Sequence, residues 1–240
     1  DITDDLDHVQ SIYAADFDGD GAMEVLSAAS IDAKVVWYKW LNTCDGDPCP
    51  SPPSPSAATL ENQFLWAYND ITPAGALTLE AWVKLDEQPP SSSGFSFISQ
   101  YNESGDQRSF LLPYLTSGIS IGTYSDGTAE KGTGCIVPYS LNNDQWYHIA
   151  ATYEYNNGSS EPDYNIYING APVGSCSEVG YGGIHAGNAP VRIGGHDNPV
   201  RGQYKGDIDQ VRIWSYARSA TEIRDNLWTE DCSAQGLLAF

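Results

Sequence analysis

The chain has 240 residues, with 11 Lys and Arg against 32 Asp and Glu, so its formal net charge is −21. This excess of carboxylates excludes nucleic acids as partners, because proteins bind them by neutralising phosphates with Lys and Arg, and it favours a bound cation. No stretch approaches the roughly 20 apolar residues of a membrane-spanning helix, and the opening DITDD lacks the pattern of a signal peptide.

The composition predicts an all-β protein. Seven Trp, fifteen Tyr and 23 Gly accompany a single Met, a mixture typical of strands joined by many turns. Three pieces are predicted: residues 1–43, a Cys/Pro/Ser-rich linker at 44–56 and a large domain at 57–240. The linker, CDGDPCPSPPSPS, contains five Pro, which are excluded from the interior of a sheet.

Residues 1–43 contain the sharpest motif, an acidic loop with carboxylates at its first, third, fifth and ninth positions. Oxygen ligands in this arrangement can converge on Ca²⁺, and four carboxylates so close together repel one another unless a cation neutralises them. A solvated acidic turn is the alternative. The predicted ligands, with a backbone carbonyl from the seventh position, are Asp16, Asp18, Asp20, Ala22 and Glu24.

The large domain is predicted to consist of short strands. LTLEAWVKL (77–85) alternates apolar and polar residues, and further strands follow at 95–99, 109–115, 118–124, 145–155, 164–170, 171–176, 191–195 and 206–216. Asn169-Gly170 is a strong hairpin signal. Ser219 and Glu222 form a capping box that predicts one short helix. GLLAF at the end predicts a further strand that is cut short, so the jelly roll is expected to lack part of its last strand.

These segments resemble the laminin-G-like, concanavalin A-like jelly roll over about 57–240. The residues that carry the resemblance are LTLEAWVKL, QWYHIAATY, YINGAPVGS and GDIDQVRIWSYARSATEI. It implies two curved antiparallel sheets of about six or seven strands each, with a short helix and a final strand after DIDQVRIW. Members often hold calcium at the rim of a sheet. Asp209 is therefore a candidate for a second calcium site, and a hydrogen-bonded structural Asp is the alternative.

Residues 9–40 resemble one FG-GAP repeat of the kind that builds integrin-type β-propellers. The resemblance rests on VQSIYAADFDGDGAMEVLSAAS and KVVWYKW and implies a small β-blade-like unit whose acidic loop holds calcium. A propeller needs several such blades, so a single one is expected to lean on the jelly roll, on another chain or on further sequence.

Cysteines and sequons indicate a secreted or cell-surface, oxidising setting. Within the expected fold, a bridge between Cys135 and Cys176 would join two strands, the short Pro-containing loop favours Cys44–Cys49, and the partner of Cys232 is left open. Sequons stand at Asn102 and Asn157. The linker resembles the hydroxyproline-rich segments of plant and algal glycoproteins, which implies O-glycans at the linker prolines Pro52, Pro53 and Pro55.

No enzymatic motif is complete. Gly118-Ile-Ser120-Ile-Gly122 alternates like a strand and lacks the strand-to-helix turn of a hydrolase nucleophile. Laminarinase-like relatives of the jelly roll carry E-x-D-x-x-E, where this chain has Asp207-Ile-Asp209-Gln-Val-Arg212. Glu80 is expected to face outward without a partner, and His148 is expected to be structural. A non-enzymatic protein follows.

Two functions are weighed. The first is an extracellular structural or adhesive module, stabilised by calcium and glycosylated, that assembles with itself or neighbouring modules through unpaired β-edges into a fibre or filament. The alternative is a calcium-dependent carbohydrate-binding module. Loop residues that could stack on or touch a sugar are Tyr101, Tyr124, Tyr155, Tyr181, Tyr204 and the segment His196-Asp197-Asn198.

Overall fold

The structure, a computed structural model, describes residues 75–90, 94–155, 162–177, 182–197 and 202–228, together with the strands at 9–15, 24–29, 34–39, 58–61, 65–67 and 237–239. The strands at the N-terminus form a three-stranded antiparallel sheet in the order β1-β2-β3. Their bounds are Val9–Ala15, Glu24–Ala29 and Lys34–Lys39. The predicted ligands Asp16, Asp18, Asp20 and Ala22 lie outside the described residues, whereas Glu24 is the first residue of β2.

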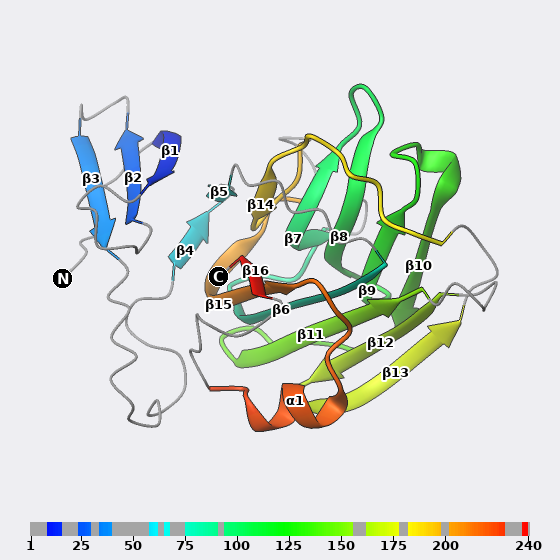
Figure 1. Ribbon diagram of the computed structural model, residues 1–240. Helices are drawn as coiled ribbons and strands as arrows, with labels where there is room; N and C mark the ends of the chain where they lie inside the picture. Colours follow the sequence, from blue (N-terminus) through cyan, green and yellow to red (C-terminus); the bar gives the residue numbers. More distant parts are fainter. Residues whose placement is uncertain are drawn as a thin grey trace.

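Two larger sheets face each other as a sandwich (Figure 1). One has six strands in the order β10-β9-β8-β7-β14-β5. In that order the bounds are Gly132–Val137, Gly118–Tyr124, Gln107–Leu115, Phe95–Asn102, Val191–Ile193 and Leu65–Ala67. A 3₁₀ turn at Ala129–Lys131 precedes β10.

The second sheet has seven strands in the order β13-β12-β11-β6-β15-β16, with β4 also paired to β15. In that order, ending with β4, the bounds are Ala171–Ser177, Asp163–Ile168, Trp146–Glu154, Ala76–Leu85, Lys205–Trp214, Leu237–Ala239 and Ala58–Glu61. The antiparallel jelly-roll sandwich expected from the sequence is confirmed, including a final strand that returns to β15.

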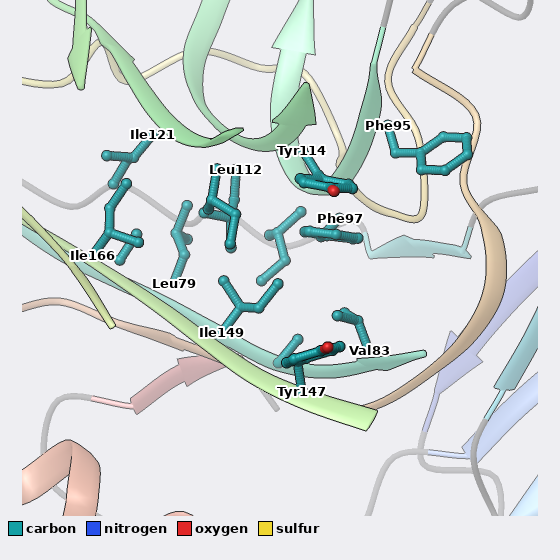
Figure 2. Close-up of a cluster of buried hydrophobic side chains, with 14 of the residues drawn as sticks. Leu79, Val83, Phe95, Phe97, Leu112, Tyr114, Ile121, Tyr147, Ile149 and Ile166 are labelled. Carbon is teal, nitrogen blue, oxygen red and sulfur yellow. The ribbon is translucent and has the colours of Figure 1, made fainter. Parts of the chain in front are cut away.

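The core lies between the two sheets because the long strands send alternate apolar side chains inward. Leu79 and Val83 from β6 and Ile149 from β11 meet Phe97 and Leu112 from the opposite sheet, and all five are fully buried (Figure 2). Burial of such side chains stabilises a fold by about 1.5–3 kcal/mol each. A disulfide between Cys135 in β10 and Cys176 in β13 joins the two sheets at one edge, as predicted.

The outer face of the seven-stranded sheet is partly covered by α1, Ala220–Asp225, and by the chain on either side of it (Figure 1). The predicted capping box is present: the Ser219 side chain accepts the Glu222 N–H, and the Glu222 side chain accepts the Ser219 N–H. Ile223 of the helix packs on Ala150 and Tyr167. Trp228, just beyond α1, stacks on Trp82 of β6 with ring centroids 4.1 Å apart.

The hairpin between β12 and β13 turns at Asn169-Gly170, as predicted. Both residues have positive φ, 51° and 76°, which is the backbone of a type I′ turn. A Cβ on Gly170 would lie 3.0 Å from the Cα of Arg224. The glycine therefore serves both the turn and the close approach of α1.

Candidate functional site

Two clusters of aromatic and charged side chains stand out, and they differ in their access to solvent. The first, which we call the buried charge cluster, consists of Glu80, His148, Arg212 and Arg218. Glu80 and His148 are fully buried, and the two Arg are 2% and 5% exposed. The cluster lies on the outer face of the seven-stranded sheet, beneath the chain that leads into α1.

Glu80 is the centre of the buried charge cluster. Its Oε1 accepts hydrogen bonds from Arg218 Nη1 and Trp214 Nε1, both at 2.5 Å, and lies 3.4 Å from Arg212 Nε. Its Oε2 lies 3.3 Å from His148 Nε2. The Arg218 guanidinium also lies 4.3 Å from the centroid of the Trp214 ring. These contacts tie the segment before α1 to the sheet.

The charges in this cluster fix one protonation state. Burial by itself would raise the pKa of Glu80, but the hydrogen bond from His148 and the charges of Arg212 and Arg218 lower it to about 2. Burial lowers the pKa of His148 and outweighs the attraction of Glu80. Glu80 is therefore ionised and His148 neutral. A site closed in this way is structural.

The expectation for Glu80 was wrong in part. The side chain leaves the core face of β6, as alternation predicts, but it is sealed under the α1 segment with four partners. A signal was present in the sequence, since Arg212 and Arg218 are basic residues close to a predicted helix. The prediction of a structural His148 is confirmed.

The second cluster, which we call the Tyr101 cluster, is partly exposed and lies at one end of the six-stranded sheet. Tyr101 stands near the end of β7, Tyr124 is the last residue of β9, and His196 and Asp197 follow β14. Arg108, near the start of β8, completes the group. A register shift between Gln100 and Tyr101 changes the direction of the side chains here, which is a common use of β-bulges next to functional sites.

The Tyr101 ring joins the cluster together. Its centroid lies 5.5 Å from that of Tyr124 and 5.6 Å from that of His196, both in edge-to-face geometry. The Arg108 guanidinium lies 5.5 Å from the same centroid, within range of a cation–π interaction. Arg108 Nε also donates to the Tyr101 hydroxyl at 3.3 Å.

Carboxylates surround these rings. Asp197 Oδ2 accepts the Glu103 N–H at 2.8 Å, and Asp197 Oδ1 lies 3.3 Å from His196 Nδ1. Asp106 accepts from Arg108 at 3.0 Å. Burial, with a smaller contribution from Tyr101, raises the pKa of Tyr124, so its hydroxyl stays neutral. The Tyr101 cluster thus presents aromatic rings, neutral hydroxyls and charged planar groups together.

The structure tests the list of loop residues proposed to contact a sugar. Tyr101, Tyr124, His196 and Asp197 come together. Tyr204 does not belong with them, because it is fully buried in the core and its hydroxyl lies 2.6 Å from the Lys84 carbonyl oxygen. Tyr155 packs against the core as well, and Tyr181 and Asn198 lie outside the described residues.

Arg108 and Glu103 were missed by sequence reasoning. The hairpin of β7 and β8 pairs Tyr101 with Arg108, and a symmetric turn at Ser104-Gly105 would have predicted that pair. Glu103 depends on contact with Asp197 across 94 residues, for which the sequence contains no signal.

Asp209 has its own hydrogen bond, in which its Oδ1 accepts the Gln210 N–H at 2.8 Å, and it is 5% exposed. Among the described residues, no three His, Cys, Asp or Glu side chains are grouped so that they could hold a metal ion. Calcium binding by Asp209 and by the acidic loop stays a prediction.

Asn102 Oδ1 accepts the Ser104 N–H at the tip of the β7–β8 hairpin, and its glycosylation stays a prediction. Asn157, Pro52, Pro53, Pro55, Cys44, Cys49 and Cys232 lie outside the described residues. Ser120 is part of β9 and donates to the Cys135 carbonyl, so the hydrolase-like string is a strand, as expected. In the described part of the chain, no helix has the length and apolar character to cross a membrane.

Fold and clusters together define a β-sandwich module of the lectin and glucanase type. The family model of the concanavalin A-like lectin/glucanases superfamily matches residues 59–224, and the chain belongs to this family. No curated protein matches the sequence significantly.

Solved structures share the fold at low sequence identity. A candidate carbohydrate-binding protein of Bacteroides ovatus is 16% identical, with a TM-score of 0.57 over 96% of this chain and 60% of that chain. Domain 4 of AbnA, an extracellular arabinanase of Geobacillus stearothermophilus in complex with arabinotriose, is 15% identical, with a TM-score of 0.54 over 91% of this chain and 87% of that chain. The NanB sialidase of Streptococcus pneumoniae is 19% identical, with a TM-score of 0.52 over 70% of this chain and 26% of that chain.

Proposed function

We propose that the chain is an extracellular carbohydrate-binding module that holds a glycan at the Tyr101 cluster. The observation that carries the proposal is the convergence of Tyr101, Tyr124, His196 and Asp197 in a partly exposed group. Aromatic rings stack on the apolar faces of sugars, while carboxylates and guanidinium groups hydrogen-bond to their hydroxyls. Membership in a family that includes lectins supports this function, as does the arabinotriose bound by domain 4 of AbnA.

The proposed module binds without cleaving. At the position of the glucanase motif, Asp207 forms an ion pair with Lys84, Asp209 is buried and Arg212 belongs to the buried charge cluster. Glycoside hydrolysis requires two carboxyl groups that flank the scissile bond, and these three residues do not offer such a pair. The disulfide between Cys135 and Cys176 supports an extracellular location.

The proposal includes a calcium site only in the acidic loop. Oxygen ligands from Asp16, Asp18, Asp20, Ala22 and Glu24 would suit a hard cation, which would stabilise the N-terminal unit. The structural or adhesive function, with self-assembly through β-edges, stays a prediction that sedimentation with calcium and with a chelator would test.

A glycan microarray, probed with and without calcium, tests the proposed function. We expect binding to a defined set of glycans, followed by at least a tenfold loss of affinity in Tyr101→Ala and Asp197→Ala by isothermal titration calorimetry. Asp225→Ala is the matched control, since Asp225 is an exposed carboxylate at the end of α1 and should leave affinity unchanged. An array without hits in either condition would reject the proposal.

A further inference from the structure

The outer face of the seven-stranded sheet carries a groove that shares no residue with the Tyr101 cluster. It lies where α1 leaves β11, β12 and β13 uncovered, and its volume is about 440 Å³. Ligand pockets in proteins are commonly about 300–1,000 Å³, so the groove can accommodate a short oligosaccharide.

The floor of the groove is built by two rows of polar side chains that run across the three strands. Strand pairing places Thr152 beside Asn165 and Asn165 beside Ser175, and two residues further along Glu154, Asp163 and Ser177 form the second row. Residues two apart on a strand share a face. The regular pairing of the sheet thus places hydroxyl, amide and carboxylate groups in two parallel rows across the three strands.

One wall of the groove is formed by the segment that leads into α1. Tyr167 lies in the lining and is 6% exposed, because Ile223 of α1 packs on it. Arg218 and Ser219, at the start of the helix, complete this side. The Tyr167 ring is therefore covered by α1, and the contacts that the groove offers to a sugar come from the hydroxyl, amide and carboxylate groups of its floor.

The polar groups of the floor have capacity left for a ligand. The Asn165 amide donates to Thr152 Oγ1 at 3.4 Å, but an amide has a second hydrogen and an acceptor oxygen. Ser177 Oγ donates to Asp163 Oδ1 at 2.8 Å, and that carboxylate can accept further hydrogen bonds. Sugar hydroxyls, which both donate and accept, match this set.

The charge of the groove restricts the class of sugar. Glu154 and Asp163 are direct cross-strand neighbours and both are exposed. The nearby Arg218 does not offset them, because its guanidinium is held by Glu80 and lies on Trp214. An anionic sugar would meet two like charges here, in a chain whose net charge is −21.

We propose that this groove is a second saccharide subsite, specific for neutral oligosaccharides and separate from the Tyr101 cluster. The proposal rests on the proposed carbohydrate-binding function and adds a second site and a charge preference to it. The groove belongs to β11–β13, whereas the Tyr101 cluster belongs to strands of the other sheet, so substitutions can separate the two.

The test is a ¹⁵N-labelled titration of the full chain with cellotriose, maltotriose and laminaritriose as neutral probes and trigalacturonic acid as the anionic probe. We expect at least one neutral probe to shift the backbone amides of Asn165 and Ser175, and the anionic probe to bind at least tenfold more weakly. Ser175→Trp should fill the groove and reduce that affinity at least tenfold. Ile136→Trp, which places the same ring on an exposed strand position, 41% exposed in the native chain, should not.

The Tyr101→Ala variant distinguishes binding in the groove from binding at the Tyr101 cluster. If neutral probes shift only amides near Tyr101 and Ser175→Trp binds normally, the groove proposal is overturned while the proposed function stands. If no probe shifts any amide and the glycan array is also empty, both fail. Shifts in the groove that persist in Tyr101→Ala and disappear in Ser175→Trp support the second subsite, and circular dichroism of each variant verifies that it has folded.

Discussion

The buried charge cluster and the Tyr101 cluster are made from the same kinds of residue, yet the structure gives them different roles. Each combines a carboxylate, a His, an Arg and aromatic rings. Glu80 and His148 are fully buried, whereas the side chains of His196 and Asp197 are each 14% exposed and Tyr101 and Tyr124 are half-buried. The residue types therefore do not distinguish a structural network from a binding site. The distinction comes from whether another segment of the chain shields the side chains from solvent.

Burial changes what each group can do. In the closed cluster, Arg212, Arg218 and Trp214 all contact Oε1 of Glu80. Removing the carboxylate charge leaves the two Arg without compensation in a poorly hydrated site. In the open cluster, water can take the place of a lost partner, so a substitution there should cost stability little and ligand affinity more. Four predictions test this comparison.

The largest effect is expected from Glu80→Gln. The variant leaves Arg212 and Arg218 buried without their counter-ion, which should lower the free energy of unfolding by about 3–5 kcal/mol. Urea denaturation measures the change. A loss below about 1 kcal/mol would show that water reaches the cluster.

Acid should weaken the closed cluster in two stages. The pKa of His148 is lowered from 6.5, so the unfolded chain takes up a proton first, and stability should fall as the pH drops below 6.5, by at most about 1.4 kcal/mol per pH unit for one group. The pKa of Glu80 is lowered from 4.5 to about 2, so its contribution, fully present above pH 4.5, is lost as the pH falls toward 2.

Urea midpoints at pH 7, 5.5 and 4 measure the first stage of this decline and the onset of the second. The His148→Gln variant removes the first stage, so its stability should change less between pH 7 and 5.5 than that of the native chain, whatever its absolute value. An equal decline in both proteins would assign the first stage to other groups.

Tyr101→Ala should lower the affinity for a glycan more than it lowers the stability of the fold. We expect a loss of about 1 kcal/mol in the free energy of unfolding, because the ring is partly exposed, together with the tenfold or greater loss of glycan affinity proposed above. If this variant destabilises the fold as strongly as Glu80→Gln, then the Tyr101 cluster is structural too.

The smallest effect is expected from Glu154→Gln, the same substitution as at Glu80 but at an exposed position. Glu154 faces Asp163 directly across β11 and β12, and like charges in such a pair are destabilising by about 0.2–1 kcal/mol. Removal of one charge should raise the free energy of unfolding by that amount at low salt and by less at high salt. A loss of stability would mean that the carboxylate has a structural partner.

Strand positions were largely predictable from the sequence, because alternation and turn residues act locally. The strand predicted at 118–124 is β9 itself, and the turn at Asn169-Gly170 and the capping box at Ser219 are present. Strand β10 was missed: its sequence, GTGCIV, contains two glycines and little apolar alternation. It belongs to the sheet because it pairs with β9 along its whole length.

Alternation failed where the strands contain bulges. Between Asp209 and Arg212 the register of β15 shifts against β6, with Gln210 at φ 46°. The extra residue returns Arg212 to the outer face, opposite Glu80, where strict alternation would send it into the core. A second shift, between Gln100 and Tyr101, brings Tyr101 opposite Arg108.

The sequence by itself determined the all-β class, most strands, the helix α1 and the family, because these depend on patterns within about ten residues of chain. Tertiary structure alone decided which polar residues are sealed and which remain open. Glu80 meets Arg218 across 138 residues, and Glu103 meets Asp197 across 94. A strand pattern states the face on which a side chain stands, but what covers that face depends on contacts between distant segments, and that cover separates a structural ion network from a candidate binding site.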